Sequence, residues 1–434
     1  MLTIVVIIGL YVLLSGLIYI ILRKKAVPLS WQQIALFFGV KIAAGCLYGY
    51  IYGRFYHGDD TWGLNHDAWI QYQRLLHAPG LFFKGLFTLH PLPDAELYFG
   101  EFSTRLEYWE FALFTRIMAP FNLISQGNYY INVVFFNFLS FWGAYFLYTL
   151  ICANMREYGR RLAPTGNHSQ KPASPIRPYS PIFVTISVFL FLPALFWLSG
   201  IRAEGFILLF SGILLYYFYQ WITKPRIGNS LVCLACFGLL LILRNSFALM
   251  LVPALAAWWL SLRFRMGNGK AFGLVYGLLF LLVLVSSFLP PPYNVLRPVV
   301  QAQQSFFALH GNTRFNLTPL EYNMTSFLAV APEALVNTLL RPWPWEAKGA
   351  LQWLVALENI IVWVLIAVCI TRYGKSLRNV FHQPLAWVLL CIALTSYLLI
   401  GFIVPFPGAI VRYRVLPELF LLCLLALSLS RRDI

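Results

Sequence analysis

Long apolar runs alternate with short polar segments along almost all of the 434 residues of the chain. An α-helix needs roughly 20 apolar residues to cross a bilayer, and runs near or above that length recur throughout. The pattern predicts an all-α polytopic membrane protein with about eleven transmembrane helices, within a range of about 10–13. The expected spans are roughly 3–22, 33–52, 128–151, 181–199, 205–222, 229–243, 245–262, 271–289, 350–371, 385–404 and 413–429.

Composition supports a lipid environment. Hydrophobic residues make up 60% of the chain and charged residues only 11%, which leaves a soluble protein too little polar surface to cover its core. The seven cysteines fall within or at the edges of apolar runs. They are therefore expected to be small packed residues and not a disulfide framework.

The distribution of charge predicts the topology. If the basic segment at 23–25 is cytoplasmic, strict alternation of the spans places five other basic segments on the same side. These are 152–180, 223–228, 263–270, 372–384 and the C-terminal tail. Together the six segments hold 18 of the 32 basic residues and only two of the 16 acids. The net charge of +16 is thus a topology signal, with the N-terminus outside and the C-terminus inside, and no nucleic-acid partner is expected.

The expected organisation is one integral membrane domain, 1–434, with three notable loops. Two long loops, 53–127 and 290–349, lie on the non-cytoplasmic side and hold most of the acids. Long loops in a compact fold usually carry function. Segment 152–180, rich in Pro, Ser and basic residues, is expected to be a flexible cytoplasmic loop.

The first outer loop opens on the stretch "RFYHGDD", which ends in Asp59 and Asp60 where an apolar run leaves the membrane. Thr61 to Leu76 is expected to form a helix capped by Asp60 or Thr61, with Asp60 and Asp67 two turns apart on one face. Residues 105–121 have the pattern of an amphipathic helix lying in the interface plane. Carboxylates at a bilayer edge are costly without water or a partner, so they are candidates for function.

Two other interpretations of these acids stay open. Asp59 and Asp60 could simply cap the helix and help to set the topology. His57, Asp59, Asp60, His66 and Asp67 are also potential ligands for a divalent metal, although their spacing matches no specific metal site.

The acidic motif in the first large outer loop, followed by interfacial helices, resembles the GT-C superfamily of membrane glycosyltransferases. This superfamily includes protein O-mannosyltransferases and the lipid A aminoarabinose transferase. Three further stretches are similar to bacterial members: "LPALFWLSGIRAEGFILL" (192–209), "LILRNSFALMLVP" (241–253) and "GAIVRYRVLPELFLLCLLAL" (408–427). In that family the acidic loop usually follows the first membrane helix. Here it follows the second, so residues 1–25 would form an additional helix.

The resemblance implies transfer of a sugar from a polyprenyl-phosphate donor to a lipid, glycan or protein acceptor, with inversion. The site would lie on the outer face of a multi-pass protein of the bacterial inner membrane. Asp59 or Asp60 would act as the general base, and arginines would stabilise the lipid phosphate. No cofactor is implied with certainty, and assistance by a divalent metal stays open. The candidate substrate-binding residues are Asp67, His57, Arg202, Glu204, Arg244, Arg314, Arg341, Arg412 and Arg414.

Several of these charged residues also have structural interpretations. Arg244 interrupts an apolar run, and it could extend to the interface simply to keep its charge in water. Glu204 could be only the ion-pair partner of Arg202, and Arg412 and Arg414 could be interfacial anchors. Segment 290–349 is rich in Asn, Gln, Tyr and Trp, a mixture that suits sugar binding by stacking and neutral hydrogen bonds.

Two alternative functions use the same residues. A transporter or flippase for lipid-linked sugars would bind the phosphate without chemistry, and Lys41 and Glu358 inside apolar runs would then matter more than the acidic pair. A polysaccharide polymerase or ligase would use a diphosphate-linked oligosaccharide donor.

Overall fold

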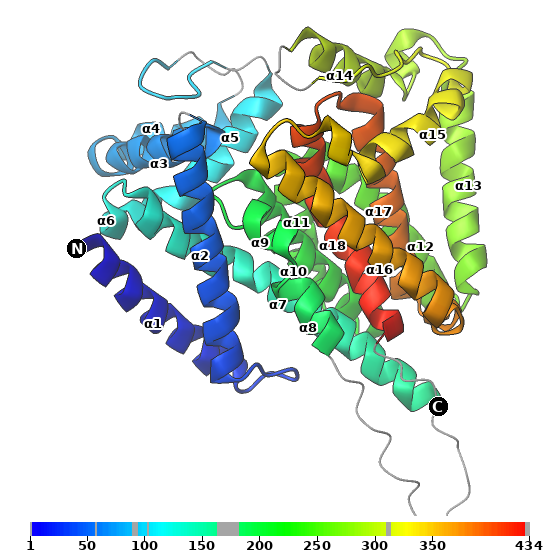
Figure 1. Cartoon of the computed structure of the whole chain (residues 1–434), viewed down its shortest axis with the longest axis horizontal. Coiled ribbons are helices and arrows are strands. Elements are labelled where there is room, and N and C mark those ends of the chain that lie inside the picture. Colours follow the sequence, from blue (N-terminus) through cyan, green and yellow to red (C-terminus); the bar gives the residue numbers. More distant parts are fainter. Residues whose placement is uncertain are drawn as a thin grey trace, which may run out of the picture. The chain divides into compact units, whose positions relative to one another are not determined.

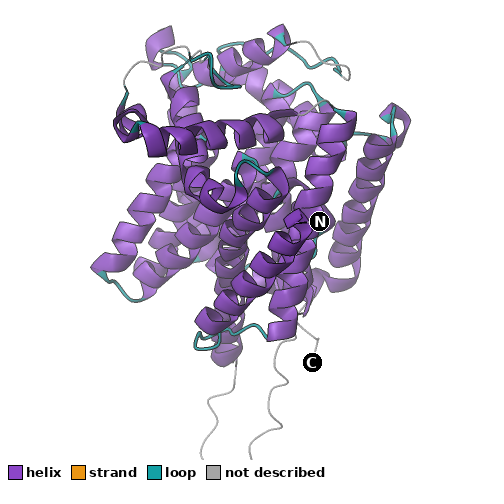
Figure 2. Cartoon of the chain, turned by 90° about the vertical axis from the view of Figure 1, so that its left-hand side faces the viewer, coloured by secondary structure: helices purple, strands orange, loops and turns teal. Residues whose placement is uncertain are grey.

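A computed structural model describes residues 2–56, 59–88, 94–101, 104–162, 182–309 and 314–429. Every regular element in these residues is a helix, and they contain no strand (Figure 2). The all-helical fold predicted from the sequence is therefore confirmed for this part of the chain.

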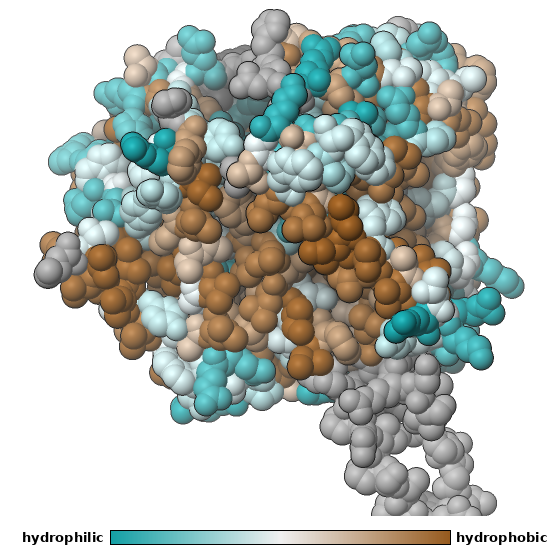
Figure 3. All heavy atoms as spheres, viewed as in Figure 1, coloured by the Kyte–Doolittle hydropathy of each residue, from teal (hydrophilic) through white to brown (hydrophobic). Residues whose placement is uncertain are grey.

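Eight helices in the described residues are long and apolar enough to cross a membrane, as expected for a multi-pass membrane protein. They are α1 (Leu2–Leu22), α2 (Trp31–Phe55), α7 (Tyr129–Leu162), α10 (Ala203–Thr223), α12 (Asn245–Arg263), α13 (Asn268–Ser286), α16 (Ala350–Val380) and α17 (Pro384–Ile403). Apolar side chains cover much of the surface of α1 and α16 on the face shown in Figure 3. Three further apolar helices among the described residues, Ile182–Trp197, Ile227–Leu243 and Met324–Leu340, are shorter, and the predicted number of about eleven spans stays a prediction.

The expected span 181–199 is broken into two short helices. They are α8 (Ile182–Phe189) and α9 (Leu192–Trp197), and Pro193 lies in the first turn of α9. Proline has no N–H to donate to the carbonyl four residues earlier, and its ring clashes with that carbonyl. A continuous helix through Phe189 is therefore disfavoured, although hydropathy alone does not register the break.

The expected outer loop 290–349 contains two helices that the sequence analysis did not place. They are α14 (Arg297–Ala308) and α15 (Met324–Leu340). Pro332 and Glu333 interrupt the apolar run of α15, so its sequence does not follow a clear helical pattern.

The expected flexible loop 152–180 is helical at its start, because α7 continues to Leu162. Residues 163–180 lie outside the described residues.

The helices group into two compact units, and the first consists of residues 1–152 and 188–248. Besides the elements named above, it contains α3 (Asp59–His77), α4 (Pro79–Phe87), α5 (Arg105–Met118), η1 (Ala119–Phe121), α6 (Asn122–Ser125) and α11 (Ile227–Leu243). Helix α2 begins at a capping box in which Ser30 accepts from Gln33 N–H and the Gln33 side chain accepts from Ser30 N–H.

The first expected outer loop is helical where the sequence indicated helices. The prediction for Thr61 to Leu76 corresponds to α3, but α3 begins at Asp59, so the predicted caps Asp60 and Thr61 lie inside the helix. The prediction for 105–121 corresponds to α5 and η1. Figure 1 shows α3 and α4 lying across one end of α2, and α3 packs against both. The interfacial position of these helices stays a prediction.

Close helix packing in the first unit depends on a pair of glycines. A Cβ added to Gly212 of α10 would lie 2.1 Å from the carbonyl oxygen of Gly143 in α7. A Cβ on Gly143 would likewise meet the backbone of α10 at 2.4 Å. Two helix backbones can approach this closely only where neither carries a side chain, as small residues allow in membrane helix pairs.

The second unit consists of residues 153–187 and 249–434. It also contains η2 (Pro291–Tyr293), η3 (Pro344–Glu346) and α18 (Pro407–Leu429). Helix α17 packs against α14, α15 and α18, and α16 packs against α18. A buried cluster that includes Val300, Phe327, Ala334 and Phe402 joins α14 and α15 to the end of α17.

Candidate active site

The centre of the candidate site is Arg202, the residue that precedes α10. Its side chain is only 5% exposed. Its guanidinium donates to Asp59 Oδ2 and to Asp60 Oδ2, in both cases at 2.6 Å, and to the Tyr48 hydroxyl at 3.0 Å. The fold thus joins the acidic pair at the start of α3 to an arginine about 140 residues later in the chain.

Asp59 and Asp60 form the first turn of α3, where the positive end of the helix dipole favours carboxylates. Asp59 has a φ of +37°, in the left-handed region that aspartate tolerates better than most residues. The two side chains are 28% and 44% exposed, respectively. Asp60 is therefore the carboxylate more accessible to a bound molecule.

Glu204 and Arg244 extend the cluster. Glu204 Oε2 lies 3.8 Å from Arg202 Nε, and its Oε1 lies 3.5 Å from an Arg244 guanidinium nitrogen. Glu204 is nearly buried, whereas Arg244 is 30% exposed and lies between α11 and α12. From the sequence, Glu204 could be only an ion-pair partner of Arg202; in the structure it bridges Arg202 and Arg244.

The protonation of Arg202 follows from its neighbours. Burial lowers its pKa, but the Tyr48 hydroxyl and the carboxylates of Glu204, Asp60 and Asp59 raise it by more, so that the pKa lies well above its usual range. Arg202 is therefore a permanent cation, and it can orient two carboxylates at once through separate guanidinium nitrogens.

The turn that carries Arg202 is held from several sides. Ser199 Oγ accepts from Lys41 Nζ at 3.3 Å, and its carbonyl accepts from Asn137 Nδ2 at 2.9 Å. The carbonyl of Ile201 accepts from Thr61 Oγ1 at 3.2 Å. Thr61 directly follows Asp60, and Ile201 directly precedes Arg202. This hydrogen bond therefore holds together the two backbone segments that carry the Arg202–Asp60 pair. Lys41, an intramembrane charge in the sequence analysis, thus has a local structural partner.

Asp67 has a different environment, although it lies on the same helix. It is completely buried, and it accepts backbone N–H groups from Tyr98 at 2.6 Å and Phe99 at 3.0 Å. The ring of His66 contacts it at 3.1 Å. Asp67 anchors the loop 94–101 on α3, so the structure gives this predicted substrate-binding residue a structural task outside the Arg202 cluster.

We expect Asp67→Asn to lower the free energy of unfolding by about 1–3 kcal/mol, because the amide nitrogen cannot accept from a buried N–H. Unfolding can be followed with a thiol-reactive dye, since all seven cysteines are free and none is exposed. Glu107→Gln is a matched control, because glutamine preserves the capping box at the start of α5. Equal stability of the two variants would contradict the anchoring role of Asp67.

Four predicted substrate-binding arginines belong to the second unit, so their positions are described within it alone. Arg314 is exposed and donates to the Phe307 carbonyl at 2.9 Å. Arg341 pairs with Glu346 at 3.2 Å, and Arg412 donates to the hydroxyl of Tyr413 at 2.9 Å.

Arg414, the fourth, is buried, and its guanidinium donates to the carbonyls of Thr338 and Arg341 at 2.9 Å and 2.7 Å. These carbonyls lie at the C-terminal end of α15, so Arg414 caps that helix.

The suggested metal site finds no support in the described part of the chain. His57 lies outside the described residues, and the residues that the structure does describe contain no group of three or more His, Cys, Asp or Glu side chains able to hold a metal ion.

Tyr48 is the main residue of the site that the sequence analysis missed. Tyr48 is buried, carries no charge and lies inside an apolar helix, so a search for charged residues did not select it. A signal was present, because Tyr48, Tyr52 and Tyr56 are spaced by four residues. The Tyr48 and Tyr52 rings stack with their centroids 4.4 Å apart, and the Tyr52 and Tyr56 rings are tilted with their centroids 5.1 Å apart.

Comparison of the chain with protein-family models, curated proteins and solved structures found no match.

Proposed function

We propose that the protein is a GT-C-like membrane glycosyltransferase that moves a sugar from a polyprenyl-phosphate donor to an acceptor hydroxyl on the outer face of the bacterial inner membrane. The observation that supports this proposal most is the acidic pair held by buried Arg202 next to the end of an apolar helix. A carboxylate fixed in this way and still exposed has the properties of a general base.

In this proposal Asp60 is the base. The acceptor hydroxyl attacks the anomeric carbon, its proton passes to Asp60, and the bond from that carbon to the phosphate oxygen breaks. The polyprenyl phosphate leaves with the electron pair, and attack from the opposite face inverts the anomeric centre. When Asp60 becomes neutral, Arg202 stays paired with Asp59, so the buried cation never loses all of its charged partners.

Arg244 is the proposed contact for the leaving phosphate. It is a partly exposed cation connected through Glu204 to Arg202, which fixes its position relative to the acidic pair. A fixed guanidinium stabilises the negative charge that develops on the phosphate oxygens as the bond breaks.

The deciding experiment is sugar transfer in proteoliposomes supplied with labelled polyprenyl-phosphate sugars and a membrane extract as acceptor source. We expect transfer by the wild type and by Glu107→Gln, and at least about a 100-fold lower rate for Asp60→Asn. The rates are compared at equal amounts of folded protein. We expect Asp60→Asn to fold, because the Asp60 side chain is exposed enough for asparagine to be accommodated. Absence of transfer with every donor, together with protein-dependent movement of labelled lipid across the bilayer, would favour the flippase alternative and refute the transferase.

A further inference from the structure

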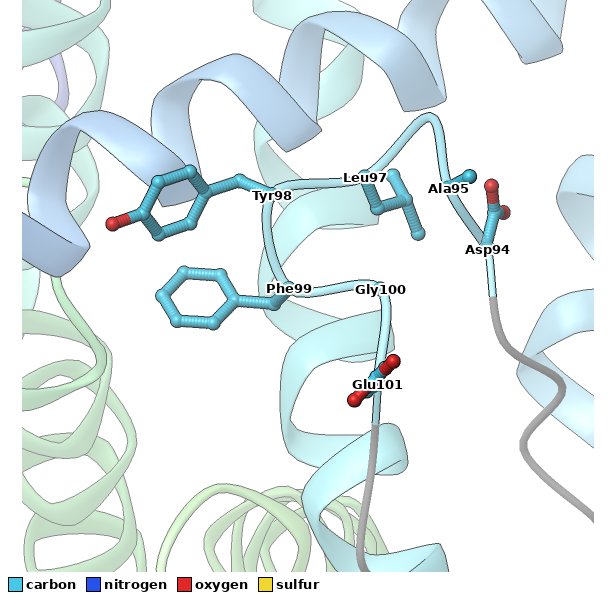
Figure 4. Close-up of a pocket in the computed structure, with 7 residues that line it drawn as sticks. All are labelled: Asp94, Ala95, Leu97, Tyr98, Phe99, Gly100 and Glu101. Carbon is cyan, nitrogen blue, oxygen red and sulfur yellow. The ribbon is translucent and has the colours of Figure 1, made fainter.

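The loop 94–101 of the first unit lines an open depression with aromatic and acidic side chains. The rings of Tyr98 and Phe99 point away from the carboxylates of this loop (Figure 4), and Asp94 is already paired with Arg74 at 2.6 Å. The depression is therefore not a built site. A stronger candidate lies in the second unit, where charged side chains of α16 and α18 meet inside the helix bundle.

Glu358 is a carboxyl group on α16, one of the helices that are long and apolar enough to cross a membrane. It lies one turn from Leu354 and from Ile361, two apolar side chains that are 64% and 53% exposed. Glu358 is half-buried, and among the residues that the structure describes it has neither a hydrogen-bond nor an ion-pair partner. A carboxylate ion at this position would be costly, because the water lost around its charge is not replaced by such a partner.

The charges that act on Glu358 come from α18, which packs against α16 (Figure 1). They are Arg414 and Glu418, both nearly inaccessible, and Arg414 Nε lies 3.7 Å from Glu418 Oε2. The short helix η3 also packs against α16 and carries Glu346, but Glu346 is paired with Arg341 at 3.2 Å. Two carboxyl groups in this part of the described structure therefore face one guanidinium.

A buried hydroxyl from a third helix belongs to the same group. Tyr397 of α17 is 2% exposed, and Glu418 and Arg414 both act on its hydroxyl electrostatically. Within the described ranges this hydroxyl makes no hydrogen bond. Buried hydroxyls almost always have a partner, so the group contains an unused acceptor for a proton carried by a neighbouring carboxyl group. The intramembrane cluster thus consists of Glu358, Tyr397, Arg414 and Glu418.

We propose that this intramembrane cluster is a proton-binding site and that Glu358 is the group that carries the proton. The proposal goes beyond sugar transfer and does not depend on it. Glu418 has Arg414 at ion-pair distance, so it stays ionised and balances the guanidinium. With a proton on Glu358 the cluster then has no net charge. Without that proton, two negative charges would face one positive charge away from water, and like charges close together disfavour the second ionisation.

Infrared spectra of the full chain in nanodiscs at neutral pH test the proposal, because a protonated carboxyl group and a carboxylate ion absorb in separate bands. We expect Glu358→Gln to lose the band of one protonated carboxyl group relative to the wild type. Glutamine has nearly the size and the neutrality of the protonated acid, so this variant is expected to fold. Glu321→Gln, at an exposed position of the same unit, should instead lose a carboxylate band. Loss of a carboxylate band in Glu358→Gln would overturn the proposal.

Modification by dicyclohexylcarbodiimide identifies the protonated residue independently. This apolar reagent enters bilayers and reacts with a protonated carboxyl group. The proton goes to one nitrogen of the reagent, the carboxyl oxygen bonds to its central carbon, and the adduct rearranges to a stable N-acylurea. We expect mass spectrometry to find Glu358 modified at least about 100-fold more than Glu321, because an exposed glutamate is almost fully ionised at neutral pH. Equal modification of the two residues would contradict a proton on Glu358.

The dependence of this modification on pH and on salt identifies the occupant of the site. Modification of Glu358 should decrease as the pH rises, because the reagent requires the proton. It should stay the same when sodium chloride replaces choline chloride at constant pH. Loss of modification on addition of sodium ions would show that the cluster holds a metal cation in place of a proton, and it would overturn the proposal.

Discussion

Arg202→Met is expected to abolish sugar transfer and to lower the free energy of unfolding by about 3–5 kcal/mol, because it removes one partner of a buried ionic network. The guanidinium is nearly inaccessible and contacts Asp59, Asp60 and, at longer range, Glu204. Without it, three carboxylates of like charge face one another, and Arg244 contacts one of them, Glu204. Both the stability of the first unit and the orientation of the proposed base depend on this single side chain.

Arg202→Lys separates the effect of the positive charge at this position from the effect of the guanidinium geometry. Lysine keeps the positive charge but lacks the planar fork that reaches two carboxylates through separate nitrogens. We expect a folded protein with most of its stability and with sugar transfer reduced at least about tenfold. Transfer measured in proteoliposomes, normalised to the folded fraction, gives the comparison.

Arg105→Met is the control for loss of a positive charge in the same unit. Arg105 is exposed and lies over the ring of Trp109 at the start of α5, so we expect a change within about 1 kcal/mol. If Arg202→Met unfolds at the same temperature as Arg105→Met, Arg202 does not hold the cluster together.

The helices were largely predictable because lipid imposes a simple rule. Each segment that crosses a bilayer must satisfy its own backbone hydrogen bonds, so long apolar runs become helices. A helix boundary agreed with the sequence where local hydrogen bonds define it. An example is the capping box of Thr104 and Glu107 at the start of α5. The prediction failed where one residue matters more than the mean hydropathy of its segment, as Pro193 does between α8 and α9. It also failed for α15, because Pro332 and Glu333 interrupt its apolar pattern.

The members of the candidate site were identifiable one at a time, but their partners were not. Asp59, Asp60, Arg202, Glu204 and Arg244 each stand out as charges at the ends of apolar runs, and the structure brings these five together. Which carboxylate meets which guanidinium depends on how α2, α3 and the turn before α10 pack. That packing is decided by close contacts such as the one between Gly200 and the Tyr48 ring, which hydropathy and charge do not encode.

Asp67 and Arg414 show the opposite limit of such reasoning. Both are charged groups that the sequence predicted to bind substrate. Asp67 instead accepts hydrogen bonds from backbone N–H groups, and Arg414 donates to backbone carbonyls. A carboxylate that accepts two N–H groups and a guanidinium that caps a helix satisfy buried polar groups which would otherwise be costly. From the sequence alone, these structural tasks cannot be told apart from ligand binding.

Arg414→Met is expected to lower the free energy of unfolding by about 3–5 kcal/mol through loss of the cap of α15 and of a buried ion-pair partner. Besides the carbonyls of Thr338 and Arg341, the Arg414 guanidinium contacts Asn359, and its Nε lies 3.7 Å from buried Glu418. Unfolding followed with the thiol-reactive dye measures the effect. Arg314→Met, at an exposed position of the same unit, should change stability by about 0.5 kcal/mol or less.

A double variant, Arg414→Met with Glu418→Met, decides between a structural and a ligand-binding role for Arg414. Replacing both buried charges removes the unpaired carboxylate, so the double variant should recover part of the stability that the single variant loses. If Arg414 serves structure alone, the recovered fraction transfers sugar at the wild-type rate. A double variant as stable as the wild type but without transfer would instead assign Arg414 to the lipid phosphate, as the sequence first predicted.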